Sequence, residues 1–235
     1  MIREADEAIV LVGGLGTRLR SVVADLPKPL APVAGRPFLA HLLDQMASAG
    51  LRRVILATGY RAEQVEQSIG SRWAGMDIVY SREHEPLGTG GAVRLAARQL
   101  LGTGVHLANG DTFLRYRPRA LERHVLDAGA SLGVALAHVP DVARYGAVET
   151  IAGRVAAFRE KGGHGPGLIN AGSYFLSADG VDALPADSSY SFETAVLLPL
   201  VATGGVVALT ETQDFIDIGV PEDYARAQHL LEAAG

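Results

Sequence analysis

The sequence contains no cysteine, and this absence excludes disulfide bridges, thiol catalysis and cysteine-ligated zinc sites. Its seven histidines are scattered along the chain. None of them has the H-x-H or H-E-x-x-H spacing that a histidine-based metal site would need. A metal, if the protein uses one, is therefore expected to be held by carboxylates.

Long apolar runs are also missing, since no uninterrupted run reaches the length of a transmembrane span. The segment MIREADEAIVLV has acidic residues before a short apolar run, so it predicts neither a signal peptide nor a membrane anchor. The net charge of −5 argues against a nucleic-acid partner, although a local positive site can still bind a small anion. We expect a cytoplasmic protein that binds small molecules and neither nucleic acid nor a membrane.

The 235 residues, of which 48% are hydrophobic and 20% charged, are enough for one domain with a substantial core. In the first half, strand and helix patterns alternate. Strands are predicted at 8–12, 53–58, 77–81 and 105–111, and helices at 37–50, 61–73 and just after the glycines of 89–102. This alternation predicts βαβ units and a mainly parallel sheet.

The second half is less regular. Strands are predicted at 131–139, 145–150, 153–161, 170–177, 205–211 and 215–219. Helices are predicted at 192–204, bent or ended by Pro199, and at 221–234. We predict a single α/β domain, a Rossmann-like three-layer α/β/α sandwich with a mixed, mainly parallel sheet. About 1–112 would form a nucleotide-binding half and about 113–235 an acceptor half.

A glycine-rich turn follows the first strand, in AIVLVGGLGTRLR (8–20). Gly13, Gly14 and Gly16 allow the backbone to approach a ligand closely, and successive N–H groups in such a turn can hold an anion. Thr17 and Arg18 add a hydroxyl and a planar guanidinium suited to phosphate. Neither the P-loop pattern nor G-x-G-x-x-G fits, because no lysine follows directly and position 19 is leucine. A plain structural turn remains the alternative.

Lys28 stands between Pro27 and Pro29 in LPKPLAPVAGRP (26–37). The two prolines stiffen the backbone and disfavour a helix there. A lysine held in this way is a candidate for a specific role, although a solvated charge is the ordinary alternative for a single lysine.

Taken together, GGLGTRLR and PKPLAPVAGRP resemble the signature of the sugar-1-phosphate nucleotidyltransferases. The resemblance continues in the same order through EPLGTGGA (85–92), NGD (109–111), EK (160–161), NAGSY (170–174) and DIGVPEDY (217–224). It covers about residues 8 to 225. Within that family, the motifs look most like the heptose 1-phosphate guanylyltransferases.

The resemblance implies roles for particular residues. Arg18, Lys28 and Asp111 would be catalytic, and Asp111 and Asp217 would hold Mg²⁺, which prefers oxygen ligands. The nucleotide would contact Val12, Gly13, Gly14, Gly16, Thr17, Arg18, Glu85, Pro86, Gly88, Thr89, Asn109 and Gly110. The sugar phosphate would contact Gly146, Glu160, Lys161 and Asn170.

Each of these residues also has an ordinary structural alternative. Asp111 could form an Asx turn, Asp217 could be an acid near a helix N-terminus, and Thr89 could cap the helix that follows. Glu85 could be a solvated loop acid, and the glycine-rich segment 161–167 could be either a closing loop or a hairpin tip.

The reaction that the resemblance implies is attack by a sugar 1-phosphate on the α-phosphorus of a nucleoside triphosphate. The favoured pair is GTP and D-glycero-α-D-manno-heptose 1-phosphate, whose product would feed bacterial surface polysaccharide. Three alternatives stay open: another base and sugar pair (uridylyl, thymidylyl or mannose-1-phosphate guanylyl transfer), a catalytically silent nucleotide-sugar-binding regulator, and an NAD-binding oxidoreductase, which the incomplete glycine pattern disfavours. The sequence leaves the oligomeric state open, and a homo-oligomer is compatible with it.

Overall fold

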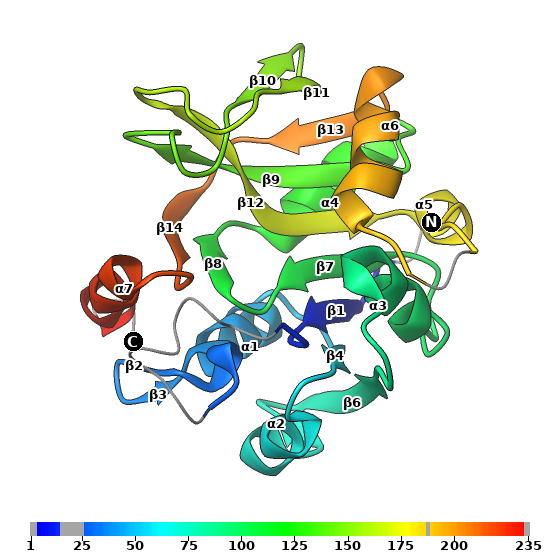
Figure 1. The fold of residues 1–235 in the computed structure, drawn as a ribbon. Helices are drawn as coiled ribbons and strands as arrows, with labels where there is room; N and C mark the ends of the chain where they lie inside the picture. The colour runs from blue at the N-terminus through cyan, green and yellow to red at the C-terminus, as the bar shows by residue number, and fades with distance from the viewer. Residues whose placement is uncertain (1–3, 15–25, 187–188, 233–235) are drawn as a thin grey trace.

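The computed structural model describes residues 4–14, 26–186 and 189–232. Its core is a sheet with the strand order β10-β11-β13-β9-β12-β7-β1-β4-β6-β5 (Figure 1). In sequence order these strands are β1 (Glu7–Leu11), β4 (Arg53–Thr58), β5 (Arg72–Trp73), β6 (Met76–Arg82), β7 (Val105–Asn109), β9 (Leu132–Val139), β10 (Val148–Ile151), β11 (Arg154–Phe158), β12 (Gly167–Leu176) and β13 (Val206–Leu209).

Four neighbouring strands, β7, β1, β4 and β6, run parallel, and Ile9 of β1 pairs with Ile55 and Leu107. β12 joins this part to β9 through antiparallel pairing on both sides, and β13 lies parallel to β9. The mixed α/β sheet that the sequence predicts is therefore confirmed. One sheet runs through both parts of the chain, and the division into a nucleotide half and an acceptor half stays a prediction.

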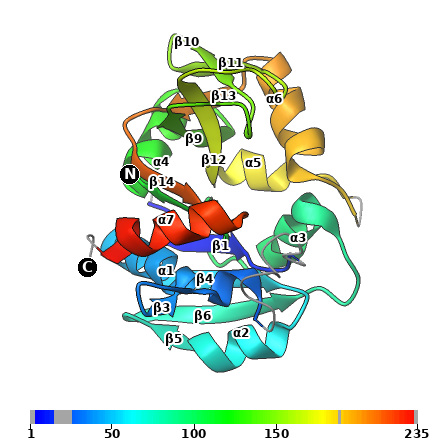
Figure 2. The ribbon, with the colours of Figure 1, turned by 60° about the vertical axis from the view of Figure 1, so that its left-hand side comes forward.

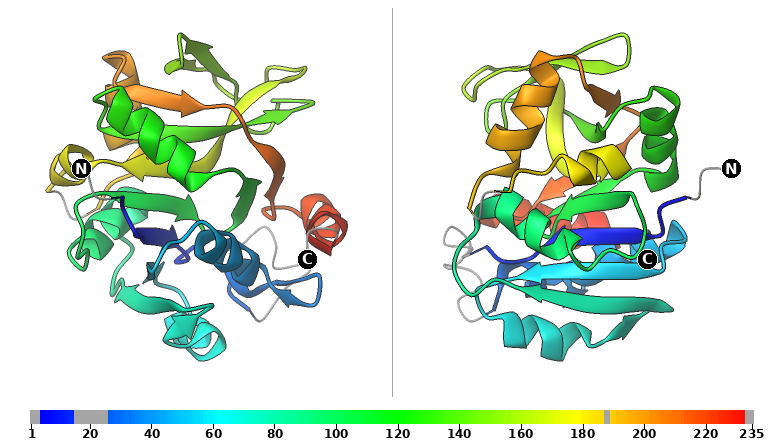
Figure 3. Two further views of the ribbon diagram at one scale, coloured as in Figure 1. Left: turned by 180° about the vertical axis from the view of Figure 1, so that it is seen from behind. Right: turned by 90° about the vertical axis from the view of Figure 1, so that its right-hand side faces the viewer.

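Helices cover both faces of the sheet because alternate strand residues point to opposite sides. Ala8 and Val10 pack with α1 (Phe38–Ser48), α2 (Ala62–Ile69) and α7 (Pro221–Glu232). Ile9 packs with α3 (Gly88–Ala97) and the segment η3–α6 (Glu193–Leu197 and Leu198–Ala202) on the other face. Seen from behind, α4 (Pro118–Asp127) crosses β9 and β13 (Figure 3). The arrangement is three-layered.

Two short antiparallel pairs lie outside the main sheet. β8 (Thr112–Arg115) pairs with β14 (Gln213–Asp217), and β2 (Pro32–Val33) pairs with β3 (Arg36–Pro37). Figures 1 and 2 show β14 leading away from the strands of the second half towards α7, and α7 contacts β2. The C-terminal helix thus returns to the first half of the chain.

Several predicted boundaries are wrong. The helix predicted at 61–73 ends at Ile69, because Gly70 has a positive φ of 74° and the chain then enters β5. The helix predicted after the glycines of 89–102 begins at Gly88 itself. Pro199 lies in the first turn of α6, where proline is tolerated, and the irregularity is a π-helical turn at Glu193–Leu197 before it.

The sequence analysis also did not predict β8, α4, the short helix α5 (Ala178–Asp182) or the β2–β3 pair. β8 follows NGD directly and α4 follows β8, in a stretch (112–130) whose residue pattern indicates neither element. In the described residues, no helix is long and apolar enough to cross a membrane.

Candidate active site

Lys28, Asp111 and Asp217 meet at one point. The Lys28 ammonium lies 2.6 Å from Asp111 Oδ2 and 3.4 Å from Asp217 Oδ1. The lysine side chain is 12% exposed, whereas the side chains of Asp111 and Asp217 are 41% and 25% exposed. The structure therefore brings together three residues that the sequence predicts to act together, with the two carboxylates open to solvent.

The prolines position Lys28. Lys28 begins a short 3₁₀ turn, η2 (Lys28–Leu30), in which Leu30 N–H donates to the Pro27 carbonyl at 2.8 Å. Pro29 and Leu30 are buried, so the turn is anchored in the core. An anchored turn between two prolines leaves the lysine little freedom, which agrees with the expectation from the sequence.

The β8–β14 pair positions the two aspartates. Thr112 pairs with Asp217, and Ile218 N–H donates to the Asp111 carbonyl at 3.1 Å. Asp111, the residue before β8, and Asp217, the last residue of β14, therefore lie at the same end of the ribbon. A two-stranded ribbon outside the main sheet brings two acids together that are far apart in the sequence.

Gly219 makes the close contact with Lys28 possible. Its N–H donates to Asp217 Oδ1 at 2.8 Å. A Cβ at this position would lie 2.9 Å from Asp217 Oδ1 and 3.3 Å from Lys28 Nζ. A side chain here would therefore push the aspartate and the lysine apart.

The glycine turn begins beside this cluster. Gly110 N–H donates to the Leu11 carbonyl at 2.8 Å, so the end of β7 lies against the end of β1. Gly14 is exposed, and a Cβ added to it would meet nothing within 4 Å. Gly13 faces Gly59 and Glu83. Val12 is buried in the core, so only its backbone could contact a nucleotide. Gly16, Thr17 and Arg18 lie outside the described residues.

In the predicted base-binding segment, Glu85, Pro86, Gly88 and Thr89 are all exposed. The Thr89 hydroxyl accepts a hydrogen bond from Phe192 N–H at 2.9 Å, and Leu87 is the N-cap of α3. The alternative role of Thr89 as a helix cap is therefore wrong, and its expected contact with the nucleotide stays a prediction.

Gly88, which is expected to contact the nucleotide, and Gly90, two positions later, both lie against Tyr190 from a distant part of the chain. Gly88 has a positive φ of 67°, and a Cβ there would lie 2.6 Å from the Tyr190 carbonyl. A Cβ on Gly90 would overlap the Tyr190 ring. These glycines therefore have a packing requirement of their own, which sequence patterns do not reveal.

On the acceptor side, Gly146 and the EK segment come together. Gly146 has a positive φ of 82°, and a Cβ on it would overlap the carbonyl of Arg159, the residue before Glu160. Glu160 and Lys161 are exposed, and neither forms an ion pair with another residue of the described ranges.

Asn170 is engaged within β12. Its Nδ2 donates to the Tyr174 hydroxyl at 2.9 Å, and its Oδ1 accepts from Gly172 N–H at 3.0 Å. Burial raises the pKa of Tyr174, and the Asn170 hydrogen bond lowers it by less, so the phenol stays protonated. Gly172, with a positive φ of 70°, lies against Asn109 and Thr112. This bulge brings the acceptor-side strand next to NGD.

The sequence analysis did not single out Asp223, although DIGVPEDY contains it. Asp223 is only 2% exposed, in the first turn of α7, and its two oxygens accept from different arginines, Arg144 and Arg226. An acid in the first turn of a helix ordinarily needs no partner, because the helix dipole favours it there. The burial of this carboxylate, the one sign of a special role, is visible only in the structure.

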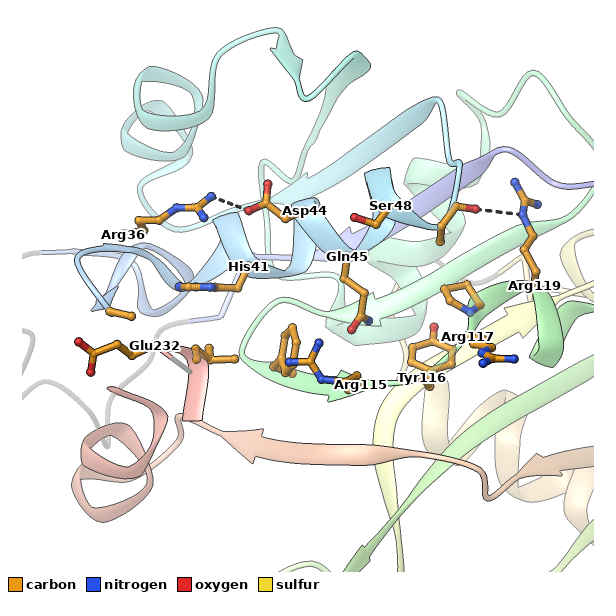
Figure 4. A pocket seen from close by; sticks show the side chains of 15 residues that line it. Arg36, His41, Asp44, Gln45, Ser48, Arg115, Tyr116, Arg117, Arg119 and Glu232 are labelled. Carbon is orange, nitrogen blue, oxygen red and sulfur yellow. Dashed lines mark hydrogen bonds and ion pairs between the residues drawn. The ribbon is translucent and has the colours of Figure 1, made fainter. Parts of the chain in front are cut away.

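A pocket lies away from this cluster. Its volume is about 670 Å³, and Figure 4 shows it between α1, β8, the start of α4 and the end of α7. Its labelled lining includes Gln45, Arg115, Tyr116 and Arg117 (Figure 4). None of the predicted site residues that the structure describes lines it, so the pocket gives no support to those assignments.

The cluster of Lys28, Asp111 and Asp217 suits two kinds of ligand at once. Two carboxylates that face one point can hold a hard cation, and Mg²⁺ takes one or two carboxylates with waters and phosphates as its other ligands. Within the described ranges, no group of three or more histidine, cysteine, aspartate or glutamate side chains could form an all-protein metal site. An ammonium beside these acids adds a contact for phosphate.

Comparison with known proteins identifies the family. The nucleotidyl transferase family profile matches residues 7–234. The chain is 43% identical over 227 residues to a D-glycero-α-D-manno-heptose 1-phosphate guanylyltransferase from Aneurinibacillus thermoaerophilus, covering 96% of this chain and 98% of that protein. It is 37% identical to a mannose-1-phosphate guanylyltransferase from Mycobacterium tuberculosis, with coverage of 94% of this chain and 63% of that protein.

A solved structure with the same fold supports this family assignment. HddC from Yersinia pseudotuberculosis, also solved in complex with GMP-PN, superposes with a TM-score of 0.84 at 35% identity, covering 96% of this chain and 99% of HddC. The family profile, the near-complete coverage and the shared fold lead to one conclusion. The chain belongs to the nucleotidyl transferase family.

Proposed function

We propose that the protein transfers a guanylyl group from GTP to D-glycero-α-D-manno-heptose 1-phosphate, giving GDP-heptose and pyrophosphate. The observation that carries the chemistry is the contact of Lys28 with both Asp111 and Asp217 beside the glycine turn. The choice of substrates rests on the similarity over nearly the whole chain to a heptose 1-phosphate guanylyltransferase.

The reaction needs no protein nucleophile. A phosphate oxygen of the sugar 1-phosphate forms a bond to the α-phosphorus of GTP, and the bond from that phosphorus to the bridging oxygen of the β-phosphate breaks. The electron pair leaves with pyrophosphate. The protein contributes position and charge neutralisation, which dominate catalysis of this kind.

Lys28 would neutralise charge around the reacting phosphates. Its ammonium is held by an anchored turn beside Asp111. It would lie where the two anionic reactants have to approach each other. Asp111 and Asp217 would hold Mg²⁺, and a bound Mg²⁺ would screen phosphate charge and align the reacting groups. Arg18, with the backbone of Gly13, Gly14 and Gly16 and the hydroxyl of Thr17, would bind the triphosphate.

The remaining residues would select the two substrates. Glu85, Pro86, Gly88 and Thr89 would lie along the base and ribose, with Asn109 and Gly110 beside the phosphates. Gly146, Glu160, Lys161 and Asn170 would contact the sugar phosphate. We place the reaction in the cytoplasm, where nucleoside triphosphates are made, and the product in the supply of bacterial surface polysaccharide.

Mannose 1-phosphate is the second candidate acceptor, because the chain is also similar to a mannose-1-phosphate guanylyltransferase. The heptose is favoured because the match to its guanylyltransferase has the higher identity and covers nearly all of that protein. A catalytically silent regulator is disfavoured, since it would have no need for an ammonium paired with two acids.

The test measures pyrophosphate release with Mg²⁺ while crossing GTP, ATP, CTP, UTP and dTTP with heptose, mannose, glucose and N-acetylmuramic acid 1-phosphates. A dominant signal for GTP with the heptose is expected. A dominant signal for another pair would keep the chemistry and replace the substrates. No signal with any pair would contradict the proposed activity.

A further inference from the structure

Arg144 and Asp223 form an ion pair that joins two segments far apart in the sequence. Arg144 lies in the turn between β9 and β10, and Asp223 lies in the first turn of α7. Arg144 Nη1 donates to Asp223 Oδ2 at 2.5 Å, across 79 residues. The Asp223 side chain is 3% exposed, whereas that of Arg144 is 46% exposed. The buried carboxylate of Asp223 therefore binds Arg144, whose side chain remains partly exposed to solvent.

Both ends of this pair are fixed. The turn that carries Arg144 is bound to the 159–165 segment, because Val142 N–H donates to the Gly165 carbonyl at 3.0 Å and Gly162 N–H to the Ala143 carbonyl at 3.1 Å. On the other side, Asp223 Oδ1 accepts from Arg226 Nη1 at 2.6 Å, one turn along α7. The position of the Arg144 guanidinium is therefore defined by the fold.

The pair lies beside the metal-site acids. Asp223 follows Asp217 by half a dozen positions, and the Tyr145 ring packs edge-on against Phe215 of β14 at a centroid distance of 5.5 Å. Burial works against the charge on Arg144, but the hydrogen bond to Asp223 and the negative charges of Asp223 and Asp217 outweigh it and raise the pKa. The guanidinium is therefore always charged and lies within the electrostatic reach of Asp217.

The Arg144 guanidinium has N–H groups that are not used in its bond to Asp223. Only Nη1 bonds to Asp223, and neither Nε nor Nη2 donates to any other described residue. Its turn also contains Gly146 and contacts the Glu160–Lys161 segment, both of which the proposed function assigns to the sugar phosphate. Arginine binds phosphate well because its planar fork can donate to two oxygens.

We propose that Arg144 binds the phosphate of the sugar 1-phosphate, and that Asp223 is the positioning residue that holds it there. Arg144 would then bind the phosphate of the acceptor substrate, while Lys28 would neutralise charge around the reacting phosphates. This inference rests on the proposed function for the identity of the ligand, but it requires only the phosphate that all sugar 1-phosphates share.

The test compares Arg144→Gln with the wild-type protein in the pyrophosphate-release assay, using whichever pair the substrate panel finds best. The KM for the sugar 1-phosphate is expected to rise about tenfold or more, since a charge-assisted bond to phosphate is lost. The KM for the nucleotide should stay within about twofold. Arg144→Lys, which keeps the charge but cannot hold Asp223 and phosphate together, should give an intermediate rise.

Arg226→Gln is the matched control, because it removes the other, more exposed arginine from the same carboxylate. It should change the KM for the sugar 1-phosphate far less than Arg144→Gln does, because Arg144 keeps its bond to Asp223. Asp223→Asn should raise the KM for the sugar 1-phosphate and leave that for the nucleotide, as expected for a residue that acts through Arg144.

Binding of the sugar 1-phosphate of the best pair, or of heptose 1-phosphate if the panel is silent, is measured by calorimetry without turnover and separates this inference from the proposed function. A Kd about tenfold weaker in Arg144→Gln, or Arg144→Lys if the first variant does not fold, would support it even if the substrate panel is silent. Equal Kd values, no binding to the wild type, or an equal rise in both KM values would overturn it.

Discussion

Lys28 Nζ and Asp111 Oδ2 lie 2.6 Å apart although 83 residues separate them in the sequence. Lys28 is one of only two lysines in the chain, the other being Lys161, while the remaining basic residues are arginines. Both lysines are in segments assigned to substrate phosphates. A compact ammonium in so confined a position is not interchangeable with a guanidinium.

Replacing Lys28 with alanine should lower kcat by about 100- to 1000-fold, the usual cost of removing one preorganised electrostatic contact. Lys28→Arg should also be impaired, because Gly219 and both aspartates crowd the ammonium and leave little room for a larger group. Steady-state pyrophosphate release measures both effects.

Arg115→Ala is the control for the Lys28 variants. It removes an exposed 2.7 Å ion pair with Asp214 in the same β8–β14 ribbon, and its activity should stay within about twofold, since exposed pairs contribute little. Near-normal turnover in Lys28→Ala would remove the lysine from the mechanism.

Asp111→Asn should lower activity and raise the Mg²⁺ concentration needed for half-maximal rate. The amide keeps the size of the carboxylate but loses the charge that a hard cation requires. A Mg²⁺ titration at saturating substrates measures this. An active variant with the wild-type Mg²⁺ requirement would show that Asp111 is not a ligand.

Gly110→Ala should destabilise the protein by about 1–3 kcal/mol, the usual cost of overpacking. The added Cβ would lie 2.6 Å from the Leu11 carbonyl oxygen and 2.7 Å from Val12 Cγ1, so backbone would have to move. Urea unfolding measures the change. Gly14→Ala is the control, because its Cβ meets nothing within 4 Å and should leave the free energy of unfolding unchanged or slightly higher.

The sequence predicted the parallel core well because its strands are short apolar runs between helices of clear period. Arg53–Thr58 is a strand with the bounds that RVILAT indicated. β8 has no such signal: it is a four-residue strand whose partner, β14, comes about a hundred residues later. Pairing over that distance is decided by tertiary packing, which local patterns do not encode.

The same contrast holds in the site. The motifs pointed to Lys28, Asp111 and Asp217, and the structure brings them together. The motifs gave no sign that Tyr190 packs on Gly88 and Gly90, or that Asp223 is buried between two arginines. Both facts depend on contacts between distant segments, so a pattern of residue types along the chain could not contain them.

A buried histidine should make the stability of the fold depend on pH. His106 of β7 is 2% exposed, and its Nε2 lies 3.5 Å from Glu122 Oε2, beyond an ordinary hydrogen bond. Glu122, on α4, accepts from Ala5 N–H at 2.7 Å and Arg119 Nη1 at 2.9 Å. Burial lowers the pKa of His106 below its ordinary 6.5, and Glu122 opposes this without outweighing it, while the Arg119 charge lowers the pKa further.

The sign follows from the protons that each state binds. The folded protein keeps His106 neutral, whereas the unfolded chain takes up a proton as the pH falls through 6.5, the ordinary value. The stabilisation is therefore complete above that pH and decreases below it, by at most about 1.4 kcal/mol per pH unit for one group. The pKa of Glu122 is lowered from 4.5, because its hydrogen bonds outweigh the effect of burial, so its contribution is lost only in more acidic solution.

Urea unfolding at a series of pH values between about 7.5 and 5.5 measures this dependence above the pH range in which carboxylates ordinarily titrate. The wild-type free energy of unfolding should fall towards the acidic end, and His106→Leu should fall less steeply. His164→Gln is the control, because that histidine side chain is 81% exposed near Asp141 and should leave the slope unchanged. If His106→Leu keeps the wild-type slope, the acid sensitivity arises at another group, since a leucine there has no proton to bind.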